Sequence, residues 1–254
     1  MKWKANASRT IWIIGASSGI GLALSEQLLK QGHKVAMSAR RTGKLGELAG
    51  EYPDQECIAP CDVTDRDSVQ KAVQRVQKCF GHIDTLIFNA GICEYIDDGD
   101  VKASVVEKVI NTNFIGLANV IEAAKPLLKD HSGAQIAAVS SSAAFLPLPR
   151  AEAYGASKAA VSYFMHTLRL AMQKKGISVN VICPGFVKTP LTDQNDFDMP
   201  CLISAEEAAE QIIAGLQRDK REIHFPHRFT RILKLLSALP LSLQQRLTGS
   251  LVKA

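Results

Sequence analysis

Residues 10–21 read Thr-Ile-Trp-Ile-Ile-Gly-Ala-Ser-Ser-Gly-Ile-Gly, an apolar run followed at once by a glycine-rich turn. The apolar run suits a strand that is buried on both faces of a parallel sheet. In the turn, Gly15, Gly19 and Gly21 let the backbone bend sharply and approach a pyrophosphate closely, while the helix that follows offers free N–H groups to the anion. The turn alone is weak evidence, because an ordinary strand-to-helix loop has the same composition.

Strand-like apolar runs and helical patterns alternate along almost the whole chain. This alternation is typical of right-handed βαβ units and a parallel sheet, and no linker, repeat or low-complexity tract divides it. We therefore predict an α/β fold: a single doubly wound domain of Rossmann type, with a parallel seven-stranded sheet and helices on both faces. Strands are expected at residues 10–15, 34–39, 56–60, 85–88, 134–140, 177–183 and near 223, and helices at 19–31, 65–80, 101–128, 153–175 and 205–216.

The end of the chain has a different pattern. Apolar side chains recur there at helical spacing, the arginines fall mostly elsewhere on the helix, and Pro240 separates a second leucine-rich piece. Residues 217–254 carry a net charge of +6, whereas the whole chain carries +5, so the remainder is near neutral. We predict a Rossmann-fold domain over residues 1–227 and a basic amphipathic tail over residues 228–254. The apolar positions of its first helical piece are Phe229, Ile232, Leu233 and Leu236.

Composition places the chain among ordinary globular proteins. Hydrophobic residues make up 46% and charged residues 22% of its 254 residues, enough for a substantial core. No apolar run reaches the roughly 18 to 20 residues that span a bilayer, and residues 1–9 lack the apolar segment of a secretory signal. We therefore expect an intracellular, cytoplasmic protein. The cysteines form no CxxC pair, and we expect buried free thiols rather than disulfides, zinc ligands or nucleophiles. They are Cys57, Cys61, Cys79, Cys93, Cys183 and Cys201.

Five further motifs follow the glycine turn in a fixed order. They are Asn89-Ala90-Gly91, Asn113 in Asn113-Phe114-Ile115-Gly116, Ser140-Ser141, Tyr154-Gly155-Ala156-Ser157-Lys158 and Pro184-Gly185. Together with the turn, whose glycine spacing is GxxxGxG, they resemble the short-chain dehydrogenase/reductase (SDR) family over about three quarters of the chain. The resemblance implies a nicotinamide-dependent oxidoreductase.

Tyr154 and Lys158 are four residues apart and therefore project from one face of a helix. An unperturbed tyrosine titrates near pH 10, about three units too high for proton exchange at neutral pH, and a nearby ammonium favours the phenolate. The resemblance implies that Tyr154 exchanges the proton, Lys158 holds the nicotinamide ribose and Ser141 hydrogen-bonds the substrate oxygen. It also implies that Asn113 positions a proton-relay water. Taken singly, these residues equally fit a surface pair, a strand-end serine and a structural asparagine.

The end of the second strand favours NADP(H) over NAD(H). An acidic residue there would bond the ribose hydroxyls and repel a 2′-phosphate, whereas Arg40 and Arg41 are able to pair with that phosphate. If these arginines only face solvent, NAD(H) remains the alternative. The resemblance adds Asp62 and Val63 as adenine contacts and Thr189 as the partner of the nicotinamide carboxamide. The other cofactor-binding residues that it implies are Gly15, Ser17, Ser18, Gly19, Ile20, Gly21, Asn89, Ala90, Gly91, Tyr154, Lys158, Pro184, Gly185 and Val187.

The chain departs from the family pattern at three positions. Ile14 and Phe88 stand where the family usually has a threonine and an asparagine that tie the first and fourth strands together, and Ala144 stands where glycine is common. We expect apolar packing to replace the polar link. The departure therefore concerns local structure rather than the chemistry.

The leading hypothesis is a hydride transfer between NAD(P)(H) and a carbonyl or secondary alcohol of a small to medium apolar substrate. A nucleotide-binding sensor or scaffold without catalysis is the alternative, and the intact catalytic residues speak against it. The substrate is set by residues 188–204, which suggest an apolar lid. The apolar side chains of this loop are Leu191, Phe197, Met199 and Leu202.

Partners are predicted more loosely. The resemblance implies a homodimer or homotetramer through the helices at residues 101–128 and 153–175, and nothing points to nucleic acid. The basic tail suggests docking on an anionic membrane through Phe229, Leu233 and Leu236, as in a membrane-surface lipid-carbonyl reductase. Packing of the tail against the body or a second subunit is favoured about twofold over that idea.

Overall fold

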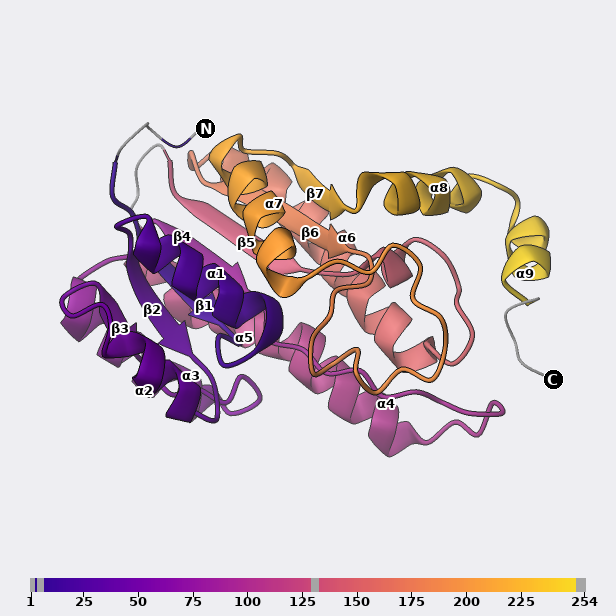
Figure 1. Cartoon of the computed structure of the whole chain (residues 1–254), viewed down its shortest axis with the longest axis horizontal. Helices are drawn as coiled ribbons and strands as arrows, with labels where there is room; N and C mark the ends of the chain where they lie inside the picture. The colour runs from indigo at the N-terminus through magenta and orange to yellow at the C-terminus, as the bar shows by residue number, and fades with distance from the viewer. Residues whose placement is uncertain (1–2, 4–6, 129–132, 250–254) are drawn as a thin grey trace.

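The computed structural model describes residue 3, residues 7–128 and residues 133–249. A seven-stranded sheet crosses the molecule in the order β3-β2-β1-β4-β5-β6-β7, with every pair parallel (Figure 1). The predicted doubly wound fold is therefore confirmed. The strands are β1 (Thr10–Ile14), β2 (Lys34–Ser38), β3 (Glu56–Ile58), β4 (Thr85–Phe88), β5 (Gln135–Val139), β6 (Ser178–Pro184) and β7 (Glu222–Phe225).

Helices cover both faces of the sheet, as α/β connections require. The helices α1 (Gly19–Lys30), α2 (Gly43–Ala49) and α7 (Ala205–Gln217) share one core, and α3 (Arg66–Phe80), α5 (Gly116–Ala124) and α6 (Glu152–Gln173) share the other. Between α4 (Ala103–Ile110) and α5 the chain forms a π-helical turn, η1 (Asn111–Ile115). Short 3-10 turns, η2 (Lys125–Leu127) and η3 (Ser142–Ala144), flank β5.

β1 shows how the sequence builds two cores from one strand. Ile11 and Ile13 point into the core of α1, α2 and α7, while Trp12 and Ile14 point into the core of α3, α5 and α6. Successive strand residues face opposite sides, so a continuous apolar run fills both. The indole Nε1 of Trp12 donates to Ser38 Oγ at 2.9 Å, which ties β1 to β2.

The predicted replacement of a polar link by apolar packing fits the structure. Ile14 of β1 and Phe88 of β4 stand in register, and each is 1% exposed. The two strands are joined through packed side chains at the position where the family has polar ones. The glycine turn begins directly after Ile14, so this packing fixes its position.

The prediction that all six cysteines are free thiols is wrong for one pair. Cys57 of β3 and Cys79 of α3 form a disulfide, and their Cα atoms lie 6.3 Å apart. The cysteines lie 22 residues apart, and only the packing of α3 on the sheet edge brings them together. The other cysteines, Cys61, Cys93, Cys183 and Cys201, are free thiols, but Cys201 is exposed.

The tail forms two helices that leave the sheet after β7 (Figure 1). These are α8 (His227–Ser237) and α9 (Leu241–Gly249), while residues 250–254 lie outside the described part of the chain. Phe229 packs on the backbone at Gly185 and stacks on Phe186 with ring centroids 5.5 Å apart. For Phe229 the favoured prediction, packing on the body, is confirmed. In the described residues, none of the helices is long and apolar enough to cross a membrane.

Candidate active site

The predicted site residues gather at the carboxyl ends of β1, β4, β5 and β6. The chain order in the sheet reverses between β1 and β4, and ligands of open parallel sheets bind in the crevice at such a point. The loops after these four strands carry, in turn, the glycine turn, Asn89-Ala90-Gly91, Ser141 and Pro184-Gly185. Segments far apart in sequence thus form one site.

The glycine turn is shaped by contacts that a side chain would block. Gly15 and Gly19 have φ angles of +84° and +52°, which L side chains rarely adopt. A Cβ at Gly21 would lie 2.1 Å from Gly15 O. Asn89 Nδ2 donates to that same oxygen at 2.8 Å, so the motif after β4 holds the turn in place. A Cβ on Gly15 would also collide with the backbone of Ala90 at 2.6 Å.

The start of α1 is open to an anion. Ser17, Ser18 and Ile20 are partly exposed, and the Ser18 side chain makes no capping hydrogen bond although it occupies the N-cap position. Free N–H groups at a helix start, together with the helix dipole, favour a phosphate. Thr189, from the loop after β6, lies against Gly19, where a Cβ would be 2.8 Å from its Cγ2. The two loops therefore flank the same space.

The predicted adenosine side contains a cavity of about 420 Å³. Arg40 and Thr64 line it from one side, and Ile92, Lys108, Asn111 and Thr112 complete its walls. Hydrogen bonds from Thr64 to Asp62 Oδ1 lower the pKa of the Asp62 carboxyl, with Arg40 contributing, so the carboxylate is held next to the lining residue Thr64. Arg41 is exposed beside it. The Val63 carbonyl accepts a hydrogen bond from Asn119, which leaves the Val63 side chain against Gly116.

Tyr154 lies near the start of α6 and is hydrogen-bonded to Ser141, which follows β5. Burial raises the pKa of the Tyr154 phenol well above its usual value, the nearby Cys93 thiol acts in the same direction, and the Ser141 hydrogen bond opposes both. Ser141 Oγ also accepts from Ala143 N at 3.1 Å, which fixes its orientation at the start of η3. Tyr154 is half-buried, and with its raised pKa the phenol is neutral at pH 7 and able to donate its proton.

Lys158 is 3% exposed and its ammonium lies 5.7 Å from the centre of the Tyr154 ring. Its Nζ donates to Val139 O at 2.9 Å, and burial lowers its pKa to about 8. A Cβ on Gly91 would approach this Nζ to 3.2 Å, so the glycine leaves room for the amine. The helical spacing does bring phenol and ammonium together as predicted. However, burial outweighs the expected lowering of the phenol pKa.

Asn113 is fully buried within η1 and links three segments. Its Oδ1 accepts from Ile92 N at 2.8 Å, and its Nδ2 donates to Ile92 O at 2.9 Å and to Ser157 Oγ at 2.9 Å. Ser157 Oγ in turn donates to Tyr154 O at 2.7 Å. The side chain therefore holds the loop after β4 against the start of α6, next to the tyrosine.

Pro184, Gly185 and Val187 lie at the end of β6 and at the start of the loop that follows it. Pro184 ends the strand, Gly185 N donates to Phe225 O at 2.6 Å, and the buried Val187 bridges to Ile203. A Cβ at Gly185 would lie 2.9 Å from the Phe229 ring, so glycine is required for α8 to pack here. Val187 therefore anchors the loop of residues 188–204 through Ile203, and Gly185 allows the tail to pack through Phe229.

Sequence reasoning missed several residues beside the site. Cys93 interacts electrostatically with both Tyr154 and Lys158 and hydrogen-bonds Tyr95; burial raises its pKa to about 11, so the thiol stays neutral. Ser140, next to Ser141, bonds the Lys158 carbonyl at 2.7 Å. The place of Cys93 and Tyr95 in the loop directly after Gly91 is the signal that could have found them.

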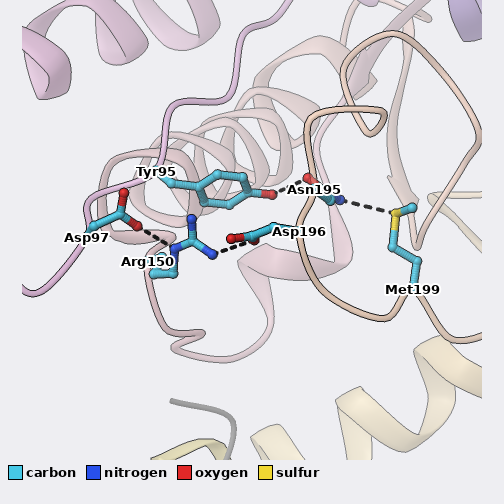
Figure 2. A network of polar contacts seen from close by, with 6 residues as sticks. All are labelled: Tyr95, Asp97, Arg150, Asn195, Asp196 and Met199. Atoms are coloured by element: carbon cyan, nitrogen blue, oxygen red, sulfur yellow. Dashed lines mark hydrogen bonds and ion pairs between the residues drawn. The ribbon is translucent and has the colours of Figure 1, made fainter. Parts of the chain in front are cut away.

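A network of polar contacts joins the loop of residues 188–204 to two other loops (Figure 2). Arg150 Nε donates to Asp97 Oδ1 and Arg150 Nη1 to Asp196 Oδ1, both at 2.6 Å, while the guanidinium lies over the Tyr95 ring at 4.9 Å. Tyr95 OH donates to Asn195 Oδ1 at 2.5 Å. We call this network the Arg150 clamp. It joins the loop after β6 to the loop after β4 and to the segment that precedes α6.

Aromatic rings form the wall behind the clamp. Phe197 contacts Tyr95 and Phe186 edge-on, with centroids 6.0 Å apart in each pair. Phe145, four residues after Ser141, lies under the Lys234 ammonium at 5.2 Å. The predicted apolar lid thus contains Phe197, while α8 contributes Phe229 and Lys234 to the wall. No cluster suited to a metal ion occurs among the described residues.

Comparison with known proteins places these features in a family context. The family model for short chain dehydrogenases matches residues 9–199. An uncharacterized oxidoreductase of Myxococcus xanthus is 32% identical over 235 residues, which cover 91% of this chain and 93% of that protein. The residues that the family model matches include the glycine turn and all of the predicted catalytic residues.

Two solved structures share the fold. One, described as ElxO with NADP bound, has a TM-score of 0.76 and 25% sequence identity, and the match covers 86% of this chain and 98% of that one. The other is a short chain dehydrogenase/reductase from Burkholderia phymatum in complex with NAD. Its TM-score is 0.83 at 20% identity, with 93% and 95% of the two chains covered.

Proposed function

This chain belongs to the short-chain dehydrogenase/reductase family and is an oxidoreductase, and from that premise we propose that it interconverts a carbonyl and a secondary alcohol with NADP(H). The observation that carries the proposal is the hydrogen-bonded Ser141–Tyr154 pair, with the buried Lys158 amine beside it, at the sheet edge where the glycine turn opens. The substrate is a small to medium apolar molecule, because the wall behind the clamp is aromatic.

Tyr154 and Ser141 act on the substrate oxygen. Ser141 donates a hydrogen bond to the carbonyl oxygen, where negative charge develops during reduction. The Tyr154 phenol, kept neutral by burial, donates its proton to that oxygen. In the reverse direction the phenolate removes the alcohol proton. Removal of such a proton donor costs roughly 100- to 10,000-fold in rate.

The remaining site residues hold the cofactor. The space that the glycines leave free, with the open α1 N-terminus, fits a pyrophosphate, and the cavity beside Arg40 and Asp62 fits an adenosine. When bound there, the nicotinamide supplies or accepts the hydride. Lys158 would hold the ribose hydroxyls and Thr189 the carboxamide, while Asn113 keeps the loop after β4 against α6. We also propose that Asn113 positions a water molecule that relays protons.

The preference for NADP(H) rests on Arg40. Its guanidinium lines the cavity, and no acidic side chain occupies the end of β2 to repel a 2′-phosphate. Binding of NADP and NAD measured by calorimetry should show tighter NADP binding, and Arg40→Ala should weaken NADP about tenfold or more while leaving NAD nearly unchanged. Lys44→Ala, on the exposed side of α2, is the matched control. Equal affinity for both cofactors would contradict the preference.

The central test is Tyr154→Phe, assayed as NADPH consumption with a panel of ketones and aldehydes. We expect turnover to fall by at least about 100-fold with cofactor affinity unchanged, since the ring and its packing remain. Tyr163→Phe, at an exposed position on the same helix, should keep full activity. Near-full activity of Tyr154→Phe would overturn the mechanism. A wild-type protein that binds NADPH but reduces no panel member would favour the sensor alternative.

A further inference from the structure

The outward face of α8 mixes arginine with large apolar side chains. Facing the body, Phe229, Thr230 and Lys234 pack on Phe186, His224 and Glu222, and the Lys234–Glu222 contact is an ion pair. The opposite side of the helix carries Arg228, Arg231, Ile232 and Leu235, all exposed; the last two are 59% and 73% exposed. Of the side chains predicted from the sequence to dock on a membrane, Phe229 faces inward, and Leu233 and Leu236 are half-buried.

The next helix continues this exposed apolar surface. On α9, leucines at three positions are 45% to 58% exposed, and Arg246 is exposed among them. Figure 1 shows α8 and α9 extending from the end of β7 beyond the sheet, away from α1 and α7. We call the exposed residues of these helices the tail face. It comprises Arg228, Arg231, Ile232, Leu235, Leu241, Leu243, Arg246 and Leu247.

The positive charge of the residues after Glu222 indicates which kind of partner fits the tail face. After Glu222 the chain contains no Asp or Glu, and Glu222 itself is paired with Lys234. A second copy docked symmetrically would place Arg228 and Arg231 opposite themselves, because such an interface joins identical patches. No carboxylate of the segment is available to neutralise them. The chemistry that complements arginines interleaved with leucines is a surface of anionic headgroups over hydrocarbon.

A cavity beside the first turn of α8 is a second, separate indication that this region binds an anionic partner. Its volume is about 190 Å³, and its charged and titratable lining residues are Arg218, Lys220, Glu222, His224 and His227. Burial lowers the pKa values of both histidines; Lys234 lowers that of His224 further, against an opposing effect of Glu222, and Lys220 lowers that of His227. Arg218 and Lys220 give the lining an excess of positive charge, because the Glu222 carboxylate is paired with Lys234, and the cavity size suits a phosphate group.

We infer that the tail face is a docking surface for an anionic lipid bilayer, with the cavity beside α8 taking a lipid phosphate. Ile232, Leu235 and the α9 leucines enter the boundary between headgroups and acyl chains, while Arg228, Arg231 and Arg246 pair with lipid phosphates. The helices lie on the bilayer and do not span it, since α8 has only 11 residues. Because the inner side of α8 forms part of the site wall, docking places the substrate entrance near the lipid surface.

Sedimentation with vesicles tests this inference on the full chain. We expect binding to vesicles of phosphatidylcholine with about one third phosphatidylglycerol at about 0.1 M salt, and little binding to pure phosphatidylcholine. Arg228→Gln with Arg231→Gln should weaken binding about fivefold for each arginine. Ile232→Ser with Leu235→Ser should weaken it at least about tenfold. Val101→Ser, at a comparably exposed site before α4 (64% exposed), is the matched control and should bind as the wild type does.

The outcomes are separable from those of the enzyme assay. Absence of binding to anionic vesicles, or equal binding by all variants, would overturn the inference whatever the enzymatic activity. A change from a larger to a smaller oligomer in the Ile232→Ser, Leu235→Ser variant, without any lipid binding, would assign the tail face to a second copy instead. Circular dichroism and NADPH binding of each variant establish that it is folded.

Discussion

Lys158 is a buried amine whose protonation state changes near physiological pH. Burial lowers its pKa to about 8, from an ordinary value near 10.5. The ammonium is therefore present below about pH 8 and is lost as the pH rises through that value. The Tyr154 phenol titrates far above this range, so it stays a proton donor throughout.

Carbonyl reduction should therefore decline above about pH 8. The charge of Lys158 orients the ribose and favours proton transfer through Tyr154, and both effects disappear when the amine is neutral. We expect kcat/KM, measured from pH 6 to 10, to fall with one apparent pKa of about 8. Lys158→Arg, which stays charged, should show a lower rate without that fall. An unchanged profile in this variant would assign the titration to another group.

A side chain at Gly91 should also disturb the position of Lys158. An added Cβ would lie 3.2 Å from Lys158 Nζ and 3.3 Å from Asn113 Oδ1, both of which are held by hydrogen bonds. Gly91→Ala should displace the amine and lower kcat/KM by roughly 10- to 100-fold, with little change in Tm. Gly46→Ala, where a Cβ meets nothing within 4 Å, should instead keep full activity and gain about 0.5–1 kcal/mol of stability.

Residue types and spacing predicted a set of residues that the structure brings together at one edge of the sheet, and their roles stay predictions. The spacing of Tyr154 and Lys158 correctly placed them together, because helix geometry is local. The sign of the phenol pKa shift was not predictable, because it depends on burial by segments distant in sequence. Cys93 was missed for the same reason: nothing local distinguishes a thiol beside Tyr154 and Lys158 from a core thiol.

Among the elements, long periodic helices were predictable and short or irregular ones were not. The expected helix at residues 153–175 is α6, which lies within two residues of both bounds. α2 was missed because it has seven residues, two of them glycine. The stretch 101–128 was expected as one helix, yet η1 interrupts it where Asn113 bonds to Ile92, a contact 21 residues away. That tether has no counterpart in helical periodicity.

The Arg150 clamp holds the whole loop of residues 188–204 through contacts to Asn195 and Asp196. Arg150 adopts a φ of +63° and joins Asp97 to Asp196, so it holds residues 188–204 in place at some conformational cost. Because exposed ion pairs contribute only about 0–1 kcal/mol each, Arg150→Ala should free the loop without unfolding the domain. We expect faster hydrogen–deuterium exchange at residues 193–199 and a Tm loss below about 4 °C.

The control for the clamp is Lys30→Ala, which removes an exposed ion pair with Glu26 on α1. It should leave exchange in residues 193–199 unchanged. If Arg150→Ala accelerates exchange equally in the central strands, the arginine stabilises the fold as a whole and the clamp assignment is wrong. An increased KM with unchanged kcat for the panel substrates would show that the closed loop contributes to substrate binding.

The architecture of the whole molecule follows from the alternation of apolar runs and helices. Right-handed crossovers and one change of winding direction are enough to produce the order β3-β2-β1-β4-β5-β6-β7. The same reasoning does not reach the Cys57–Cys79 pair or the inward face of α8. Both depend on packing between segments whose separation along the chain carries no periodic signal.

The outer surface of α6 leads to a prediction about the assembly. Tyr163 and Leu170, seven residues apart on this helix, are 77% and 70% exposed, and Ile115 of η1 is also exposed. Large apolar side chains at this spacing form one stripe, which a second copy would cover. We expect a homodimer through α6, measured by light scattering after gel filtration. Leu170→Glu should convert it to a monomer, because an isologous interface brings two copies of the charge together. Leu235→Glu, on the tail face, should remain dimeric; a dimer that survives Leu170→Glu but not Leu235→Glu would move the interface to α8.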